Sequence, residues 1–178
     1  MDLRALTADE GVALTSTANE MVAEGTGILA ADESIGTIAK RFTLIGVEST
    51  QESRRAYRDM LFSTPKLADH ISAVILHDET IQQRMDEGAP IPEYLASRGL
   101  IPGIKVDKGL VPLSPRSEER VTAGLDGLAA RRLAYRALGP RFAAWRAGGR
   151  LESVAPACRA SRVQPGPAGR VPPLVRGR

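Results

Sequence analysis

The chain has 178 residues, 43% of them apolar and 25% charged, with a net charge of +3. These fractions are typical of a soluble globular protein with one ordinary core. No run approaches the roughly 18 apolar residues of a membrane span, and no basic and apolar leader opens the sequence. The single cysteine, Cys158, excludes an internal disulfide. We therefore expect a cytoplasmic protein with no membrane partner.

The N-terminal segment predicts a helix, a strand and a charged turn. Thr7 and Glu10 form a capping box, so we expect a helix over residues 7–23. Residues 27–31 are apolar and form the first expected strand. Two carboxylates, a Ser/Gly/Thr turn and a cationic segment follow this strand. Such a strand, acid and helix start are typical of a βα corner that binds an anion.

Helices and strands are expected to alternate through residue 146. Thr50 can cap a helix that ends at Phe62, with Ala56, Met60 and Leu61 on its apolar face. Strands are predicted over residues 71–76, 103–108 and 142–146. Ile81 and Met85 are expected to lie in the first turns of a short helix. A second helix is expected over residues 92–97, and a third from Leu125 towards Gly139. Strands separated by helices predict an α/β fold with a parallel sheet.

The pattern breaks at residue 147. Residues 147–178 contain five prolines, six arginines and one acid, Glu152, with no hydrophobic periodicity. All four lysines of the chain precede this segment. We expect residues 147–178 to form a disordered Arg/Pro/Gly-rich tail, separate from the ordered part at residues 1–146. The shift in composition suggests a different coding origin, which the other reading frames of the transcript would test.

The first candidate group is the pair of acids after the first strand. Asp32 and Glu33 lie where the carboxyl end of a parallel strand faces a ligand site. Either acid could take part in acid–base chemistry, or the pair could simply cap the next helix, as Ser34 and Thr37 also could.

The second candidate group consists of cations. Lys40 and Arg41 could clamp a phosphate, or they could lie on a solvated helix face. The same alternatives apply to Arg54, Arg55 and Arg58 on the next helix.

Alternation along the third strand puts Lys105 and Asp107 on one face, opposite Ile104 and Val106. That face is either a charged ligand site or the wet side of an edge strand. His70, His77 and Cys158 lack the spacing of metal ligands, so we expect no metal and no cofactor. No Gly-x-Ser-x-Gly turn supports a serine triad.

These segments together resemble class I fructose-bisphosphate aldolase in its animal and plant form. The matching segments are residues 27–34, 36–41, 53–55, 73–80, 102–109, 124–128 and 142–146. The resemblance implies that residues 1–146 form part of a TIM (β/α)8 barrel, roughly the first four strands with their helices. It implies a homotetrameric family that cleaves fructose 1,6-bisphosphate into dihydroxyacetone phosphate and glyceraldehyde 3-phosphate. The chemistry of that family uses a lysine Schiff base and no metal.

The resemblance also implies roles for individual residues. It makes Asp32 the acid that assists the Schiff-base and carbon–carbon bond chemistry. It assigns contacts with the substrate and its phosphates to five cations, which are Lys40, Arg41, Arg54, Lys105 and Arg146.

The sequence departs from the family at two places that matter for catalysis. Ala144 stands where the family has a catalytic lysine, within Phe-Ala-Lys-Trp-Arg. The Schiff-base lysine and a glutamate acid–base belong to later strands, which residues 147–178 do not match. We therefore expect a truncated aldolase-type chain that is inactive by itself.

Two alternatives stay open. The first is a non-catalytic binding module that uses the basic corner or the Arg-rich tail for an acidic partner or RNA. The tail has no interleaved aromatic residues, so we do not expect sequence-specific nucleic-acid binding. The second is an unstable product, because four strands of an eight-stranded barrel leave two open sheet edges.

Overall fold

Helices and strands alternate along the chain, as the sequence predicts. The structure, a computed structural model, describes residues 6–115 and 118–147, so the expected tail lies outside the described residues from residue 148 onwards. The helices are α1 (Ala8–Met21), α2 (Ile35–Leu44), α3 (Gln51–Phe62), the 3-10 turn η1 (Leu67–Asp69), α4 (Asp78–Ile81), α5 (Ile91–Ser97) and α6 (Leu128–Arg136). The strands are β1 (Gly27–Ala31), β2 (Ile71–Leu76), β3 (Ile101–Lys105), β4 (Leu110–Pro112), β5 (Arg120–Thr122) and β6 (Phe142–Ala144).

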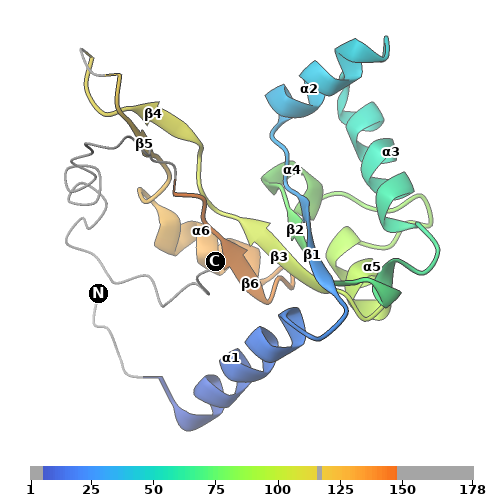
Figure 1. Cartoon of the computed structure of the whole chain (residues 1–178), viewed down its shortest axis with the longest axis vertical. Helices are drawn as coiled ribbons and strands as arrows, with labels where there is room; N and C mark the ends of the chain where they lie inside the picture. Colours follow the sequence, from blue (N-terminus) through green and yellow to red (C-terminus); the bar gives the residue numbers. More distant parts are fainter. Residues whose placement is uncertain (1–5, 116–117, 148–178) are drawn as a thin grey trace.

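A parallel sheet of four strands, in the order β1-β2-β3-β6, forms the centre of the fold. In Figure 1, α3 and α5 lie to one side of this sheet, α6 lies by β6, and the β4–β5 hairpin extends away from it. Since all four strands run the same way, their carboxyl ends meet at one edge. This arrangement confirms the predicted α/β class and the predicted number of parallel strands.

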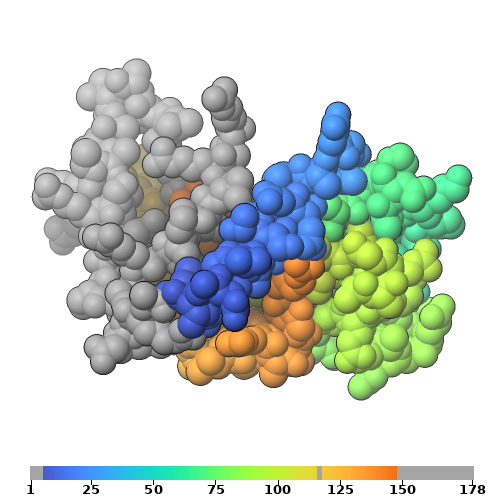
Figure 2. All heavy atoms as spheres, turned by 90° about the horizontal axis from the view of Figure 1, so that it is seen from below, coloured from blue at the N-terminus to red at the C-terminus, as the bar shows by residue number. Residues whose placement is uncertain are grey.

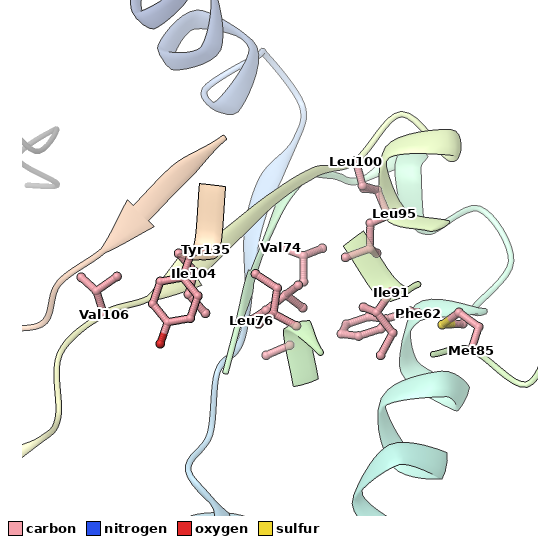
Figure 3. Packing of buried hydrophobic residues seen from close by; sticks show 12 residues of the cluster. Phe62, Val74, Leu76, Met85, Ile91, Leu95, Leu100, Ile104, Val106 and Tyr135 are labelled. Atoms are coloured by element: carbon pink, nitrogen blue, oxygen red, sulfur yellow. The ribbon is translucent and has the colours of Figure 1, made fainter. Parts of the chain in front are cut away.

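The apolar core lies on one face of the sheet, between the strands and the helices. Val74 and Leu76 of β2 and Ile104 of β3 pack there against Phe62 of α3 and Ile91 of α5 (Figure 3). Each of these side chains is buried. The continuous apolar sequence of β2 therefore has the burial expected of a central parallel strand.

Residues at the intervening positions point to the opposite face of the sheet. On that face the Phe142 ring of β6 lies directly over Gly103 of β3, its partner in the strand register. A methyl group on Gly103 would overlap the ring. Gly103 is thus required by packing rather than by a special backbone angle.

The apolar face predicted for α3 is only partly correct, because Leu61 packs against the core but the other two residues do not. Met60 is 62% exposed and Ala56 is also exposed, whereas the buried residues of α3 are Arg58 and Phe62. The reason is that the inner face of α3 follows Arg54, Arg58 and Phe62 at a spacing of four residues, and an ion pair with Glu33 compensates the buried charge of Arg58.

The bounds of three other elements differ from the sequence prediction, and one hairpin is additional to it. The short helix α4 ends at Ile81 instead of beginning there, because the His77 side chain caps its start by accepting a hydrogen bond from the Glu79 N–H. Strand β3 ends at Lys105, before a turn in which Asp107 accepts from the Gly109 N–H. Helix α6 begins only at Leu128, after a left-handed glycine, and the β4–β5 hairpin was not predicted.

Helix α1 packs against the sheet at the end opposite the charged turn. The predicted capping box of Thr7 and Glu10 is present, and the Ser72 hydroxyl of β2 donates to the Met21 carbonyl. Arg141, just before β6, forms an ion pair of 2.7 Å with Glu20, which lowers the pKa of Glu20 to about 2. Figure 2, viewed from this end, shows α1 lying beside the segment that leads into β6. No helix of the described part is both long and apolar enough to cross a bilayer.

Substitution of Gly103 by alanine tests the contact with Phe142. We expect Gly103→Ala to lower the free energy of unfolding by about 1–3 kcal/mol, because the ring must move or the strands must separate. The matched control is Gly27→Ala in β1, where an added methyl group meets no atom within 4 Å. Urea unfolding measures both variants, and equal effects would contradict the packing assigned to Phe142.

Candidate active site

A large cavity of about 1070 Å³ opens at the carboxyl ends of the four parallel strands. Four of the six predicted site residues line it, namely Asp32, Arg41, Lys105 and Arg146. Asp32 directly follows β1, Arg41 lies on α2, Lys105 is the last residue of β3, and Arg146 lies shortly after β6. The topology therefore brings together residues that are far apart in the sequence.

The corner after β1 gives its two acids different surroundings. Ser34 is the N-cap of α2, and its hydroxyl accepts a hydrogen bond from the Thr37 N–H at 3.4 Å. The helix cap is therefore provided by Ser34 and not by the acids. Asp32 borders the cavity, and the described residues offer its carboxylate no hydrogen bond or ion pair.

Glu33 is held by two arginines. Its carboxylate forms an ion pair of 2.7 Å with Arg58, whose side chain is 3% exposed, and a second ion pair with Arg41. Burial by itself would raise the pKa of Glu33, but a hydrogen bond from its own backbone N–H, the hydrogen bond and charge of Arg58, and the charge of Arg41 lower it below the ordinary value. Arg58 also donates to the Glu33 carbonyl and lies over the Tyr57 ring. Glu33 is thus a structural anchor that leaves Asp32 facing the cavity.

Two of the predicted cations do not line the cavity. Lys40 is exposed on α2. Arg54 forms a bidentate pair with Glu79, with both nitrogen–oxygen distances at 2.7 Å, and also donates to the Ser49 carbonyl. The hydrogen bond from Arg54 lowers the pKa of Glu79, and the same pair raises the pKa of Arg54.

Lys105 and Asp107 form an ion pair within the cavity, on the face that the alternation predicts. Asp107 also accepts from the backbone N–H of Gly109 and of Arg146, both at 3.1 Å. Burial raises the pKa of Asp107, but these hydrogen bonds together with that from Lys105 bring it below its usual value. Asp107 therefore ties the end of β3 to the end of β6.

Sequence reasoning missed several residues of this cavity. His77, at the end of β2, accepts a hydrogen bond at Nδ1 from the Glu79 N–H at 3.3 Å. Burial lowers the pKa of His77, so a neutral ring with its proton on Nε2 fits the site. Tyr135 donates to Asp78 at 2.8 Å, and burial followed by the Asp78 contact raises the pKa of Tyr135. Position at the end of an apolar strand was the signal that could have identified His77.

The cavity also contains cations that the sequence analysis did not select. Lys108, Arg120 and Arg131 border it, and Arg131 donates to the carbonyls of Val106 and Gly124. Among the described residues no group of three or more His, Cys, Asp or Glu side chains could hold a metal ion. The cavity is thus a cationic site with one carboxylate, Asp32, that is free among the described residues.

Removal of the buried guanidinium tests the anchoring of Glu33. We expect Arg58→Met to lower the free energy of unfolding by about 3–5 kcal/mol, because it leaves the Glu33 carboxylate without its buried partner. The control is Arg55→Met on the same helix, whose partners Glu52 and Asp86 are exposed, with an expected loss of roughly 0–1 kcal/mol. Urea unfolding measures both, and a similar small loss for Arg58→Met would rule out an essential buried pair.

The pH dependence of stability follows from the lowered pKa of Glu33. The unfolded chain binds a proton near the ordinary pKa of 4.5, whereas the folded chain binds it at lower pH. The stabilisation is therefore fully present above pH 4.5 and is lost as the pH falls through the folded pKa. We expect Glu33→Gln to unfold with a shallower dependence on acid pH than the unchanged chain. Identical profiles in urea unfolding between pH 3 and 7 would disprove this role.

Comparison with known proteins identifies the family. The sequence model of fructose-bisphosphate aldolase class-I matches residues 13–164. The match extends past residue 147, where the sequence analysis places the start of the tail. Among curated proteins, the probable fructose-bisphosphate aldolase class 1 of Xylella fastidiosa is 59% identical over 134 residues, which are 75% of this chain and 40% of that protein. The fructose-bisphosphate aldolase of Schistosoma mansoni is 52% identical over 140 residues, 78% of this chain and 39% of that protein.

A solved structure gives the same result for the fold. The aldolase of Plasmodium falciparum, in complex with TRAP and a small-molecule inhibitor, superimposes with a TM-score of 0.76 and 50% sequence identity. The superposition covers 80% of this chain and 41% of that chain. The chain thus spans about two-fifths of the length of these relatives, and the predicted partial TIM barrel is confirmed. The chain belongs to the class I fructose-bisphosphate aldolase family, of which it carries the N-terminal part.

Proposed function

We propose that the cavity is the N-terminal half of a class I aldolase active site, which binds a sugar bisphosphate. The observation that carries this proposal is the position of Asp32 in a cavity lined by Arg41, Lys105 and Arg146. A sugar bisphosphate needs cations for its two phosphates and a carboxylate near the reacting carbons. In this assignment Asp32 is the catalytic acid, and the three cations contact the substrate and its phosphates.

Lys40 and Arg54 are further proposed substrate contacts that rest on the resemblance alone. The guanidinium of Arg54 already has Glu79 and Ser49 as partners, so it could contact a phosphate only after giving up part of this network.

We propose that these 178 residues bind the substrate and do not cleave it. Ala144 follows the same alternation as Phe142 and Arg146, so the position of the family's catalytic lysine has no amine. The side-chain amine of Lys105 is engaged by the Asp107 carboxylate, so we do not assign Lys105 as the nucleophile. The chain therefore supplies binding and an acid, while the lysine that forms the imine in the family belongs to later strands that these 178 residues do not match.

The remaining features follow from the family and are proposals for this chain. They are a cytoplasmic location, a role connected with glycolysis, metal-free Schiff-base chemistry in the complete enzyme, and the homotetrameric assembly of full-length relatives. The comparisons give no support to the alternative of a separate binding module built on the basic corner or the Arg-rich tail.

A binding and turnover experiment on the purified 178-residue chain tests the proposal. Trp145, the single tryptophan, is adjacent to Arg146, so its fluorescence reports on ligand binding. We expect fructose 1,6-bisphosphate to change this fluorescence, and Lys105→Met and Arg146→Met each to weaken binding by about ten-fold or more. Arg55→Met, which removes a cation outside the cavity, is the matched control and should leave the affinity unchanged.

The turnover part of the experiment uses the same protein. A coupled assay should detect no triose phosphate above background, and borohydride with dihydroxyacetone phosphate should leave no covalent adduct on a lysine. Turnover or an adduct would contradict the claim of inactivity. Absence of binding, or equal loss in the Arg55→Met control, would contradict the assignment of the site.

A further inference from the structure

Both outer strands of the four-stranded sheet have an open edge. Within the described residues no strand lies beside the outer side of β1 or of β6. β1 is apolar along its whole length, and Ile28 is nevertheless 41% exposed, with Ala30 also exposed. An exposed apolar edge strand with unpaired backbone groups is a template for pairing with another strand.

The face of the sheet opposite the core has an apolar surface of its own. Ile28 of β1, Ile75 of β2 and Phe142 of β6 occupy positions that alternate with the core residues, and each retains exposed area. In an eight-stranded barrel the corresponding face is a packed interior filled by layers of branched side chains. Here the described residues provide four parallel strands, and therefore only part of such a layer.

Opposite charges lie at the same end of the two open edges. Asp32 directly follows β1, and Arg146 follows β6 after one intervening residue. Among the described residues neither side chain has an ion pair or hydrogen bond. The two edges are therefore complementary in charge as well as in being unpaired.

We propose that two copies of this chain associate about a two-fold axis and close an eight-stranded parallel barrel. In this dimer β6 of each copy pairs with β1 of the other copy. The two-fold symmetry then gives both open edges of each copy a hydrogen-bonding partner. The two apolar faces then pack on each other inside the barrel. At each of the two seams Arg146 of one copy faces Asp32 of the other.

The direction of the strands supports this arrangement over other contacts between edges. A two-fold axis along the barrel keeps all strands parallel, which a closed (β/α)8 barrel requires. Antiparallel pairing of β6 with β1 would place Arg146 beside Gly27 and leave Asp32 at the far end of the seam. The parallel pairing alone brings the two charges together. This inference rests on the unpaired strand edges, and it uses Asp32 and Arg146, which the proposed function also assigns to substrate binding.

The mass of the full 178-residue chain in solution is the first test. Sedimentation equilibrium should give twice the chain mass of 19.0 kDa. A lysine on the edge strand, Ile28→Lys, should weaken dimerisation by about a hundred-fold, because the ammonium would be buried in the seam. Met60→Lys, an equally large change at a 62% exposed position of α3, is the matched control and should keep the mass of the dimer.

A charge exchange keeps the proposal testable if Ile28→Lys unfolds. Arg146→Asp should weaken the dimer by about ten-fold or more, because it places acids on both sides of each seam. The double variant Asp32→Arg with Arg146→Asp restores opposite charges and should recover the dimer. Far-UV circular dichroism verifies that each variant is folded.

The outcomes separate clearly. A dimer that is lost with Ile28→Lys or Arg146→Asp and recovered by the charge exchange supports the proposal. A monomer at all concentrations overturns it and leaves the edges to another occupant, such as the remaining strands of an aldolase barrel. A dimer that none of these variants changes, or a mass other than two chains, also overturns it.

Discussion

Side-chain alternation along four parallel strands separates the burial of apolar surface from the placement of charge. Val74, Leu76 and Ile104 point to the helix side and form the core. Lys105 lies on the other face and, with Arg146, borders the cavity at the carboxyl ends of the strands. Because both sets of residues belong to the same strands, the packing that stabilises the sheet also fixes the positions of the charges. The cavity depends on this division more than on any single contact.

The corner after β1 shows how the surroundings separate two neighbouring carboxylates. The buried Arg58 and the exposed Arg41 hold Glu33 as an ionised anchor. Asp32, next to it, has no such partner among the described residues and borders the cavity. Burying a charge pair costs free energy, but removing one of its partners costs more, because the other charge stays buried and uncompensated. The ion pair between Glu33 and Arg58 therefore fixes the conformation of the turn after β1, and Asp32 remains available for a ligand.

Much of the fold could be predicted from local sequence patterns, but the ion pairs between residues of the site could not. The apolar runs of β1 and β2 and the capping residues Thr7 and Thr50 predicted their elements because each signal is local. The buried face of α3 was missed because an arginine, Arg58, occupies it. Its partner Glu33 is 25 residues away, so no spacing rule connects them. The short strands of the β4–β5 hairpin gave too little pattern to be detected.

The central claim is that these 178 residues bind a sugar bisphosphate in a cationic cavity and lack the Schiff-base lysine needed to cleave it. Phosphorus NMR of fructose 1,6-bisphosphate mixed with the chain examines both parts in one sample. The account predicts that the two phosphate resonances shift or broaden as protein is added, while no triose phosphate resonances appear. Triose phosphate signals that grow with time, in material free of full-length aldolase, would contradict it, as would sugar resonances that the protein leaves unchanged.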